Sequence, residues 1–233
     1  MSEREDDLER RLGEVRERIA SACRSAGRDP DEVTLVVVTK FFPASDVRVL
    51  ADLGVRDVGE NRHQEAAAKA EELVGLPLRW HFIGGLQSNK AAAVATYADA
   101  VHSLDRAKLV TGLSRGATER GRDLDVLVQV SLDPPGADGR SGADPDQVGE
   151  LAARVAEAEG LVLRGVMGVA PLGGDAGEAF ARLAEVAADV RRDHPGASWI
   201  SAGMSGDLDE AIARGATHLR VGSAVLGPRP ESK

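Results

Sequence analysis

The sequence contains one cysteine, few aromatic residues and no long hydrophobic run, and each shortage excludes a class of protein. Cys23 is the single cysteine in 233 residues, which rules out an internal disulfide and fits a reducing compartment, so we expect a cytoplasmic protein. No stretch approaches the roughly 18 uninterrupted apolar residues of a membrane-spanning helix. The polar start from Met1 to Asp7 also lacks the basic and apolar regions of a signal peptide.

An excess of basic charge is absent as well. The net charge is -9 and no basic stripe runs along the chain, which argues against nucleic acid or anionic lipid as a partner. Aromatic residues make up 3% of the sequence, so few rings are available for stacking on bases. The nucleotide-binding motifs G-x-x-x-x-G-K-[ST] and G-x-G-x-x-G are missing. The five histidines have no paired ligand spacing, so we predict no metal site.

What is present is an alternation of short β-rich runs and longer amphipathic runs. Strands are expected over residues 33–40, 55–59, 79–84, 100–104, 124–132, 161–167, 198–202 and 217–222. Helices are expected over residues 44–53, 61–74, 88–97, 106–121, 146–159, 175–193 and 207–214. This repetition predicts an α/β fold, a (β/α)8 TIM-like barrel, because an open doubly wound sheet usually has fewer strands.

The barrel is expected to occupy the whole chain as a single domain, residues 1–233. An extra N-terminal helix, about residues 3–26, carries apolar residues three and four positions apart and should lie against the outside or bottom of the barrel. The stretch 133–144 is rich in turn-forming residues and is interpreted as a mobile loop. The tail, about residues 228–233, is too short for a further domain.

The segment from Thr34 to Lys40 is the most informative part of the chain. Thr34-Leu-Val-Val-Val-Thr-Lys40 predicts a strand buried on both faces that ends on an amine. In parallel α/β proteins the carboxyl ends of strands hold ligands and catalytic groups, so Lys40 is a candidate site residue. Taken alone, the segment favours a solvated lysine at the strand rim, since lysine is mostly exposed. The residues near the end of the sequence favour the site role for Lys40 instead.

The last two predicted strands indicate a phosphate site. Barrels often bind phosphate between the loops that follow these strands, where glycine admits the anion and a helix N-terminus donates N–H groups. The segments 200–206 and 220–227 supply such loops, and Gly222 and Ser223 suit that role. Gly222 fits the end of a strand equally well, so the pair alone does not decide between the two.

Alternation along the eighth strand adds a buried cation. His218 and Arg220 share one face, whereas Leu219 and Val221 share the other. If the apolar pair meets the helices, Arg220 points into the barrel. A buried arginine requires a partner, so a polar ligand or an acidic neighbour is implied.

A lysine at the end of an early strand, a phosphate site after the last two strands and an inward arginine together suggest pyridoxal 5′-phosphate held as a Schiff base. The chain resembles the pyridoxal phosphate homeostasis proteins, which are similar in fold to the barrel domain of alanine racemase. The resemblance extends from about Leu12 to Gly227 and rests on Val38-Thr-Lys40-Phe-Phe-Pro43, Gly59-Glu-Asn61, Gln64-Glu65, Trp80-His-Phe-Ile-Gly84, Leu86-Gln-Ser-Asn-Lys90, His102-Ser-Leu-Asp105, Leu163-Arg-Gly-Val-Met167, Gly203-Met-Ser205 and Arg220-Val-Gly-Ser223. The ordered set is specific, although each motif alone is weak.

The resemblance implies a role for each matching residue. It implies that Lys40 forms the internal aldimine and that Arg220 faces the pyridine nitrogen. Asn61 and His81 match residues that line the pocket. The positions that match the phosphate-binding residues are Ser201, Met204, Ser205, Gly222 and Ser223. The sequence departs from the family pattern at Gly85, where proline is frequent.

The resemblance implies a protein that binds pyridoxal 5′-phosphate and maintains intracellular vitamin B6 and amino-acid homeostasis by holding and delivering this cofactor. Its implied partners are apoenzymes that depend on pyridoxal phosphate, and we expect a monomer or a weak homodimer. Because a guanidinium cannot accept a proton, Arg220 leaves the pyridine ring a poor electron sink, which disfavours decarboxylation and transamination. We therefore predict a carrier or regulator with negligible turnover.

The alternative is a pyridoxal phosphate-dependent racemase that acts on a small amino acid. Racemisation needs an acid-base group on each face of the bound amino acid. Lys40 serves one face, whereas the only tyrosine, Tyr97, lies at a predicted helix end before the fourth strand. A barrel that binds no cofactor is a third hypothesis, and it explains Lys40 only as a charge at the rim.

Overall fold

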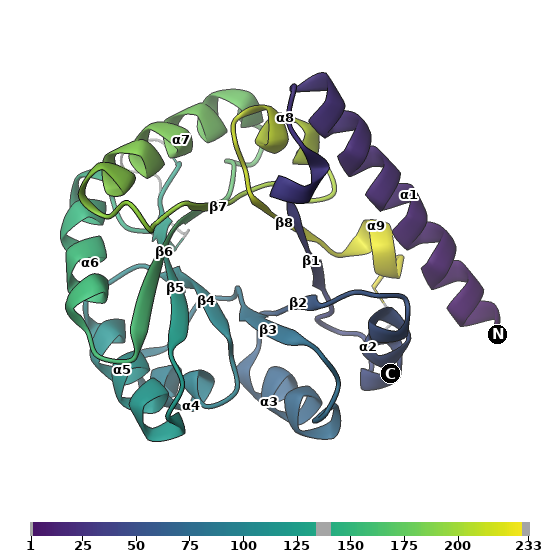
Figure 1. Cartoon of the computed structure of the whole chain (residues 1–233), viewed down its shortest axis with the longest axis horizontal. Helices are drawn as coiled ribbons and strands as arrows, with labels where there is room; N and C mark the ends of the chain where they lie inside the picture. Colours follow the sequence, from purple (N-terminus) through teal and green to yellow (C-terminus); the bar gives the residue numbers. More distant parts are fainter. Residues whose placement is uncertain (1, 134–140, 230–233) are drawn as a thin grey trace.

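In the computed structural model, residues 2–133 and 141–229 are described, and within them eight parallel strands close into a barrel surrounded by helices (Figure 1). Each strand pairs with the next one in the sequence, and the last pairs with the first. The strands are β1 Thr34–Val38, β2 Asp57–Glu60, β3 Arg79–Phe82, β4 Ala100–Leu104, β5 Leu124–Val130, β6 Leu161–Gly168, β7 Trp199–Ser201 and β8 His218–Val221. The predicted (β/α)8 barrel is thus confirmed.

The helices follow the strands in the predicted order. The α-helices are α1 Glu3–Ser25, α2 Ala44–Asp52, α3 His63–Glu72, α4 Ala91–Ala95, α5 Lys108–Arg120, α6 Pro145–Glu157, α7 Ala176–Asp193, α8 Leu208–Ala213 and α9 Ser223–Leu226. The described residues also contain the 3-10 helix η1 Pro30–Glu32, which was not predicted, and the 3-10 helix η2 Ser88–Lys90. The helix expected over residues 88–97 is therefore η2 followed by the short α4.

The strands of the barrel turn apolar residues toward the helices and polar residues inward. On β8, Leu219 and Val221 belong to the hydrophobic core between sheet and helices. His218 and Arg220 alternate with them and make polar contacts inside the barrel. Alternation along the eighth strand predicts that Arg220 points into the barrel if Leu219 and Val221 face the helices. Both apolar residues do face the helices, and the guanidinium of Arg220 points inward.

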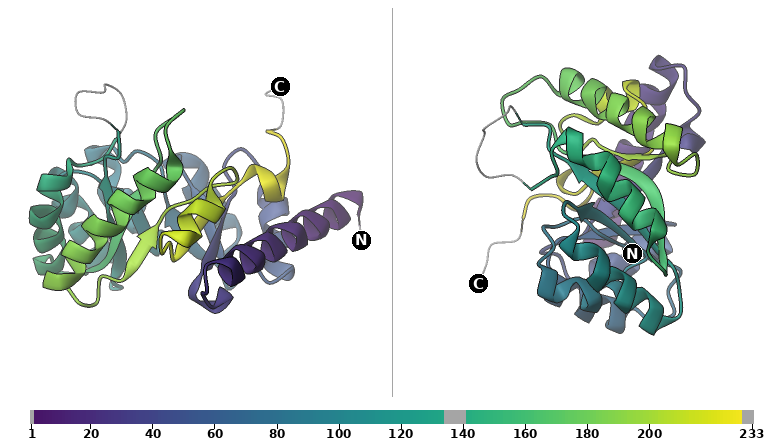
Figure 2. Two further views of the ribbon diagram at one scale, coloured as in Figure 1. Left: turned by 90° about the horizontal axis from the view of Figure 1, so that it is seen from above. Right: turned by 90° about the vertical axis from the view of Figure 1, so that its left-hand side faces the viewer.

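Helix α1 crosses the outside of the barrel beside α8 and α9 (Figure 2). It starts at a capping box formed by Ser2 and Glu5, and its buried stripe contains Leu8, Leu12, Val15, Ile19, Ala22 and Cys23. The Arg4 guanidinium donates to the backbone oxygen of Leu226 in α9 at 3.1 Å. The predicted N-terminal helix is therefore present, and it contacts the last helix of the barrel.

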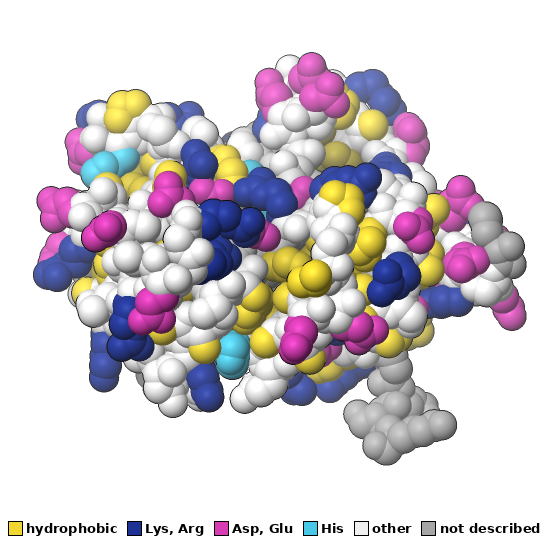
Figure 3. Space-filling model, turned by 60° about the horizontal axis from the view of Figure 1, so that its bottom comes forward, with side chains coloured by type: hydrophobic (Ala, Val, Ile, Leu, Met, Phe, Trp, Pro, Cys, Tyr) yellow, Lys and Arg dark blue, Asp and Glu magenta, His cyan; other side chains and the backbone are white. Residues whose placement is uncertain are grey.

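The surface carries charges of both signs. On the face shown in Figure 3, acidic and basic side chains are interspersed. In the part of the chain that the structure describes, no helix combines the length and apolar content needed to cross a membrane. The predicted loop over residues 133–144 falls largely outside the described residues. Its end is held to β5, because Ser131 donates its backbone N–H to the oxygen of Ala143 at 2.8 Å.

Candidate functional site

Lys40 lies in a tight turn at the carboxyl end of β1. Thr39 continues the strand pairing by donating its N–H to the oxygen of Gly59 at 2.9 Å. Phe42 then donates its N–H back to the oxygen of Thr39 at 3.1 Å, which closes the turn around Lys40. Phe41 has a φ of +71°, a strained conformation for a residue with a large side chain. Such strain persists only where neighbouring contacts impose it, and these contacts come from α3.

A buried charge cluster holds the turn from outside the barrel. The ammonium of Lys69 donates to the backbone oxygen of Thr39 at 2.8 Å, to Oε1 of Glu60 at 2.6 Å and to Oε1 of Glu65 at 2.8 Å. Glu65 Oε1 also accepts the N–H of Phe41 at 2.6 Å. Burial raises the pKa of Glu60, against the opposing influence of its hydrogen bonds from Lys69 and Thr39. The peptide groups on both sides of Lys40 are thus fixed by one cluster.

The loops after β7 and β8 meet at the same end of the barrel as Lys40. The hydroxyl of Ser223 lies 3.5 Å from that of Ser205, one on each loop. Beside them, a side chain at Gly222 would place its Cβ 3.3 Å from the backbone oxygen of Val38, so the position favours glycine. Because β8 is the neighbour of both β1 and β7, the two hydroxyls and Lys40 share one part of the rim.

Two of the predicted phosphate positions are already engaged within the protein. The backbone N–H of Met204 donates to Oδ1 of Asp207 at 2.6 Å. Ser201 has no exposed surface, and its hydroxyl accepts a hydrogen bond from Arg220. Of the five predicted phosphate positions, those that remain at this rim are Ser205, Gly222 and Ser223.

Arg220 is a buried cation below this rim. It is 5% exposed, and it donates through Nη1 to Ser201 Oγ at 2.7 Å and through Nη2 to the oxygen of Gly168 at 2.9 Å. Burial lowers the pKa of Arg220 to about 10, although the charge of Asp207 acts in the opposite direction, so the guanidinium stays charged at neutral pH. Within residues 2–133 and 141–229 no carboxylate forms an ion pair with Arg220, and its partners are neutral oxygens.

Buried histidines continue from Ser201 into the barrel. His102 Nδ1 lies 2.8 Å from Ser201 Oγ, and its Nε2 lies 2.9 Å from His81 Nδ1. His81 Nε2 lies 2.9 Å from Oδ1 of Asp57. The structure therefore places His81, predicted to line the pocket, inside the barrel with 1% of its surface exposed. The sequence interpretation missed the role of His102, although alternation along the fourth strand could have indicated an inward side chain.

Asn61 lies in the loop after β2, beside the loop after β3. A side chain at Gly84 would place its Cβ 2.2 Å from the backbone oxygen of Asn61, so the two loops contact each other closely. The side-chain oxygen of Asn61 is buried and receives no hydrogen bond from the described residues. An unpaired buried acceptor is costly, which makes Asn61 a candidate ligand contact.

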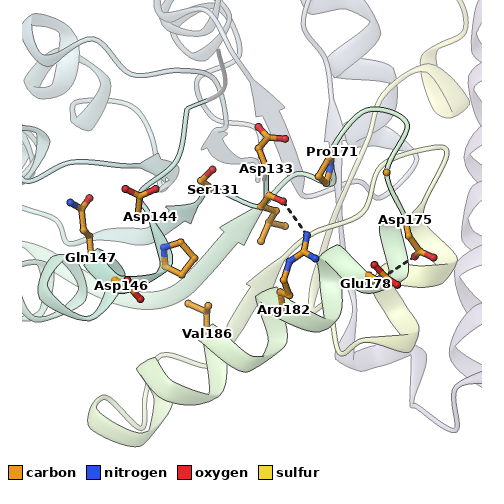
Figure 4. Close-up of a pocket in the computed structure, with 13 residues that line it drawn as sticks. Ser131, Asp133, Asp144, Asp146, Gln147, Pro171, Asp175, Glu178, Arg182 and Val186 are labelled. Atoms are coloured by element: carbon orange, nitrogen blue, oxygen red, sulfur yellow. Dashed lines mark hydrogen bonds between the residues drawn. The ribbon is translucent and has the colours of Figure 1, made fainter. Parts of the chain in front are cut away.

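A pocket of about 1020 Å³ lies away from Lys40, between α6 and α7 (Figure 4). Arg182 is its basic residue, and its guanidinium donates to the backbone oxygen of Leu132 at 3.1 Å. The acidic residues of the pocket are Asp133, Asp144, Asp146, Asp175 and Glu178. Because this acidic lining repels a phosphate, the rim at β1, β7 and β8 remains the candidate site for an anionic ligand.

Comparisons with known proteins place the chain among related sequences. The family described as "Alanine racemase, N-terminal domain" matches residues 11–230. A pyridoxal phosphate homeostasis protein of Mycobacterium tuberculosis is 45% identical over 246 residues, covering 97% of this chain and 95% of the relative. That of Escherichia coli is 38% identical over 234 residues, covering 98% and 99%. The structure of PipY from Synechococcus elongatus with PLP bound has a TM-score of 0.82 and 36% identity, covering 94% of this chain and 100% of PipY.

Proposed function

The chain belongs to the pyridoxal phosphate homeostasis protein family, and from this premise we propose that it binds pyridoxal 5′-phosphate at the rim formed by β1, β7 and β8. In this proposal it holds the cofactor and delivers it to apoenzymes in the cytoplasm, as a monomer or weak homodimer, and so maintains vitamin B6 and amino-acid homeostasis. The names of its relatives and the PLP-bound structure of PipY support the cofactor.

The residues at the rim and directly below it fit the three functional groups of this cofactor, and this match is the observation that carries the proposal. Lys40 supplies an amine for the aldehyde. Ser205 and Ser223, with hydroxyls 3.5 Å apart, supply donors for the phosphate beside Gly222. Arg220 supplies a buried cation for the ring nitrogen.

Each side chain has a separate task in holding the cofactor. When bound, pyridoxal phosphate supplies an electrophilic aldehyde and an electron-withdrawing ring. The Lys40 amine would bind the aldehyde carbon covalently, with the aldehyde oxygen released as water, while the turn fixed by Lys69 holds the backbone of Lys40 in place. The serine hydroxyls and the backbone N–H of Ser223, at the start of α9, would donate to the phosphate. Arg220 has five N–H donors, of which two go to protein oxygens, so others can serve the ring nitrogen.

The arrangement favours a carrier over a racemase. Arg220 cannot accept a proton, so the ring remains a weak electron sink. A racemase also needs a second acid-base group opposite Lys40. Tyr97 stacks on His63 with ring centroids 5.8 Å apart, beside α3 and outside the barrel, and burial raises its pKa. Tyr97 is thus unsuited to that second role.

The covalent role of Lys40 is tested by removing its amine. The purified protein should absorb in the visible range, and borohydride reduction should attach the mass of the cofactor to the peptide that contains Lys40. Lys40→Ala should abolish this absorption and leave the thermal stability nearly unchanged, because the side chain lies at a ligand site and not in the core. Lys90→Ala, a change on η2 after β3, is the control and should retain the absorption. A Lys40→Ala protein with the original spectrum would refute the assignment.

The carrier hypothesis predicts negligible turnover of amino acids. In heavy water, alanine or serine should show no exchange of the α-proton at rates typical of enzymes, which are about 1 per second or more. Proton NMR of the amino acid measures this exchange directly. Rapid exchange that is lost in Lys40→Ala would favour the racemase instead.

A further inference from the structure

A continuous series of hydrogen-bonded side chains crosses the interior of the barrel. It begins at Arg220 on β8, passes through Ser201 on β7, His102 on β4 and His81 on β3, and ends at Asp57 on β2. The four heavy-atom distances are 2.7, 2.8, 2.9 and 2.9 Å. We call these five residues the barrel chain. Of these five residues, only Arg220 has a role in the proposed binding of pyridoxal phosphate described above.

The chemistry of its two ends fixes the direction of the barrel chain. Arginine can only donate hydrogen bonds, and an ionised carboxylate can only accept them. Asp57 therefore accepts from His81 Nε2–H, which leaves Nδ1 of a neutral His81 as an acceptor for His102 Nε2–H. His102 Nδ1 then accepts the hydroxyl proton of Ser201, and the oxygen of Ser201 accepts from Arg220. Every donor points toward Asp57, and each of the four hydrogen bonds has one donor and one acceptor.

The opposite direction is unfavourable in this surrounding. If His81 carried two protons, His102 would donate to Ser201, whose own proton would then have no acceptor in the barrel chain. Two cations, Arg220 and Arg79, already face this part of the barrel. Burial holds the pKa of His102 well below its ordinary value, and it lowers that of His218, the third histidine of this cluster, to about 3. The interior therefore favours the neutral forms of His102 and His218.

Asp57, at the other end of the barrel chain from Arg220, carries the negative charge. Burial is the strongest influence on the pKa of Asp57 and acts to raise it, but the hydrogen bond from His81 and the charge of Arg79 leave this pKa below its ordinary value. Asp57 is thus an ionised acceptor at neutral pH. A cation at one end and an anion at the other polarise the whole chain in one direction.

We propose that the barrel chain orients the Arg220 guanidinium, that His102 and His81 are positioning residues for the ring end of the cofactor site, and that Ser201 is a link in this chain and not a phosphate ligand. The inference rests on the proposed function. It changes the role that the family resemblance implies for Ser201, because the hydroxyl proton goes to His102 and the oxygen is taken by Arg220.

The two roles of Ser201 predict different ligand preferences. A phosphate ligand should matter for pyridoxal phosphate and not for pyridoxal, which lacks the phosphate. A link that orients Arg220 should matter equally for both, since both contain the ring nitrogen. Affinities measured by absorbance titration of the apoprotein separate these cases. Ser201→Ala should weaken both ligands by a similar factor of roughly ten, the effect of losing one hydrogen bond to a charged group.

Two serine variants provide matched controls. Ser223→Ala should weaken pyridoxal phosphate much more than pyridoxal, because Ser223 lies at the proposed phosphate site. Ser103→Ala removes the buried hydroxyl next to His102 in the sequence, which has no hydrogen-bond partner among the described residues, and should change neither affinity. A Ser201→Ala protein that loses affinity only for pyridoxal phosphate would overturn the inference.

The tautomers of the histidines give a test that needs no cofactor. In 15N-histidine NMR of the apoprotein, His81 and His102 should both be neutral with the proton on Nε2, and Ser201→Ala should shift the Nδ1 signal of His102. His63→Gln and His194→Gln assign the signals of two histidines outside the chain. A proton on Nδ1 of His102 would contradict the inference. Failure of the unmodified protein to bind either ligand would instead refute the proposed function, so the two failures are distinguishable.

Discussion

Lys69 is a buried lysine on α3, and all three of its hydrogen bonds lead to the turn that carries Lys40. It is 6% exposed, and its partner Glu60 is 1% exposed. A buried ion pair contributes little net stability relative to an apolar pair, but removal of one partner leaves an uncompensated charge. The Lys69–Glu60 ion pair therefore positions the turn that carries Lys40, and each buried charge needs the other as its partner.

Replacement of Lys69 by methionine tests this dependence. Lys69→Met keeps the length of the side chain and strands the charge of Glu60, so it should lower the free energy of unfolding by about 3 kcal/mol. Urea denaturation measures this loss. A second change, Glu60→Gln, made in the Lys69→Met protein, should recover most of the stability, because the more deeply buried carboxylate is then uncharged, whereas Glu65 is 24% exposed and still accepts the N–H of Phe41. A double variant as unstable as the single one would show that the ion pair is not the cause.

Individual site residues were predictable from the sequence where they interrupt a simple pattern. Lys40 ends an apolar run, and Arg220 alternates with apolar neighbours, so both stand out against a regular strand. The link from Ser201 through His102 was not predictable, because it joins strands that are far apart in the sequence. A hydroxyl next to a glycine-rich loop is typical of a phosphate ligand, and only the three-dimensional neighbours of Ser201 show its other contacts.

At the scale of elements, α1 supports the loop that carries the proposed phosphate site. The Arg18 guanidinium donates to the backbone oxygen of Ser205 at 2.6 Å and also contacts Asp209 on α8. The N-terminal helix thus reaches the loop after β7, at the opposite end of the sequence. A helix outside the repeating units can in this way influence retention of the ligand.

Arg18→Ala should therefore speed the loss of pyridoxal phosphate. The Arg18 side chain is 39% exposed, so its contribution is discounted to ~1 kcal/mol, which corresponds to about a fivefold faster dissociation. Stopped-flow transfer of the cofactor to an excess of an apoenzyme measures this rate. Arg24→Ala is the matched control, because Arg24 lies on the same helix and pairs with the exposed Glu17. Equal rates in the two variants would argue against a supporting role for α1.

The order of the elements was predictable, whereas several boundaries were not. Apolar periodicity identified every strand of the barrel, because burial on both faces leaves a strong signal. The predicted strand over residues 33–40 ends earlier, at Val38, since the peptide groups of the next residues bond to α3 and to the turn. The predicted helix over residues 88–97 begins as the 3-10 helix η2, which apolar spacing cannot distinguish from an α-helical turn.

At the scale of the whole molecule, the barrel interior is polar and contains buried neutral histidines. The His218 ring packs at a tilt of 34° against Trp199 with ring centroids 4.2 Å apart, and its ring nitrogen lies 2.9 Å from the hydroxyl of Thr217. Its pKa is lowered to about 3 by burial, from an ordinary value of 6.5. The unfolded chain exposes the same histidine to water. The two states therefore bind different numbers of protons over a wide range of pH.

This difference predicts how the stability of the fold depends on pH. Between about pH 6.5 and pH 3 the unfolded state holds a proton on His218 that the folded state does not, so acidification favours unfolding. The contribution of His218 is fully present above pH 6.5 and falls by about 1.4 kcal/mol per pH unit in the middle of that range. His102, whose pKa is lowered in the same direction, adds to the slope.

Comparison with His218→Phe isolates the contribution of this histidine from those of the carboxylates. Free energies of unfolding measured in urea between pH 6 and pH 4 should decline less steeply in the variant, by about 1.4 kcal/mol per pH unit. Shifts such as the raised pKa of Glu60 are common to both proteins and cancel in the difference. His194→Phe makes the same substitution at the end of α7, outside the barrel, and is the matched control. Parallel curves for His218→Phe and the unmodified protein would mean that His218 takes up its proton without unfolding the barrel.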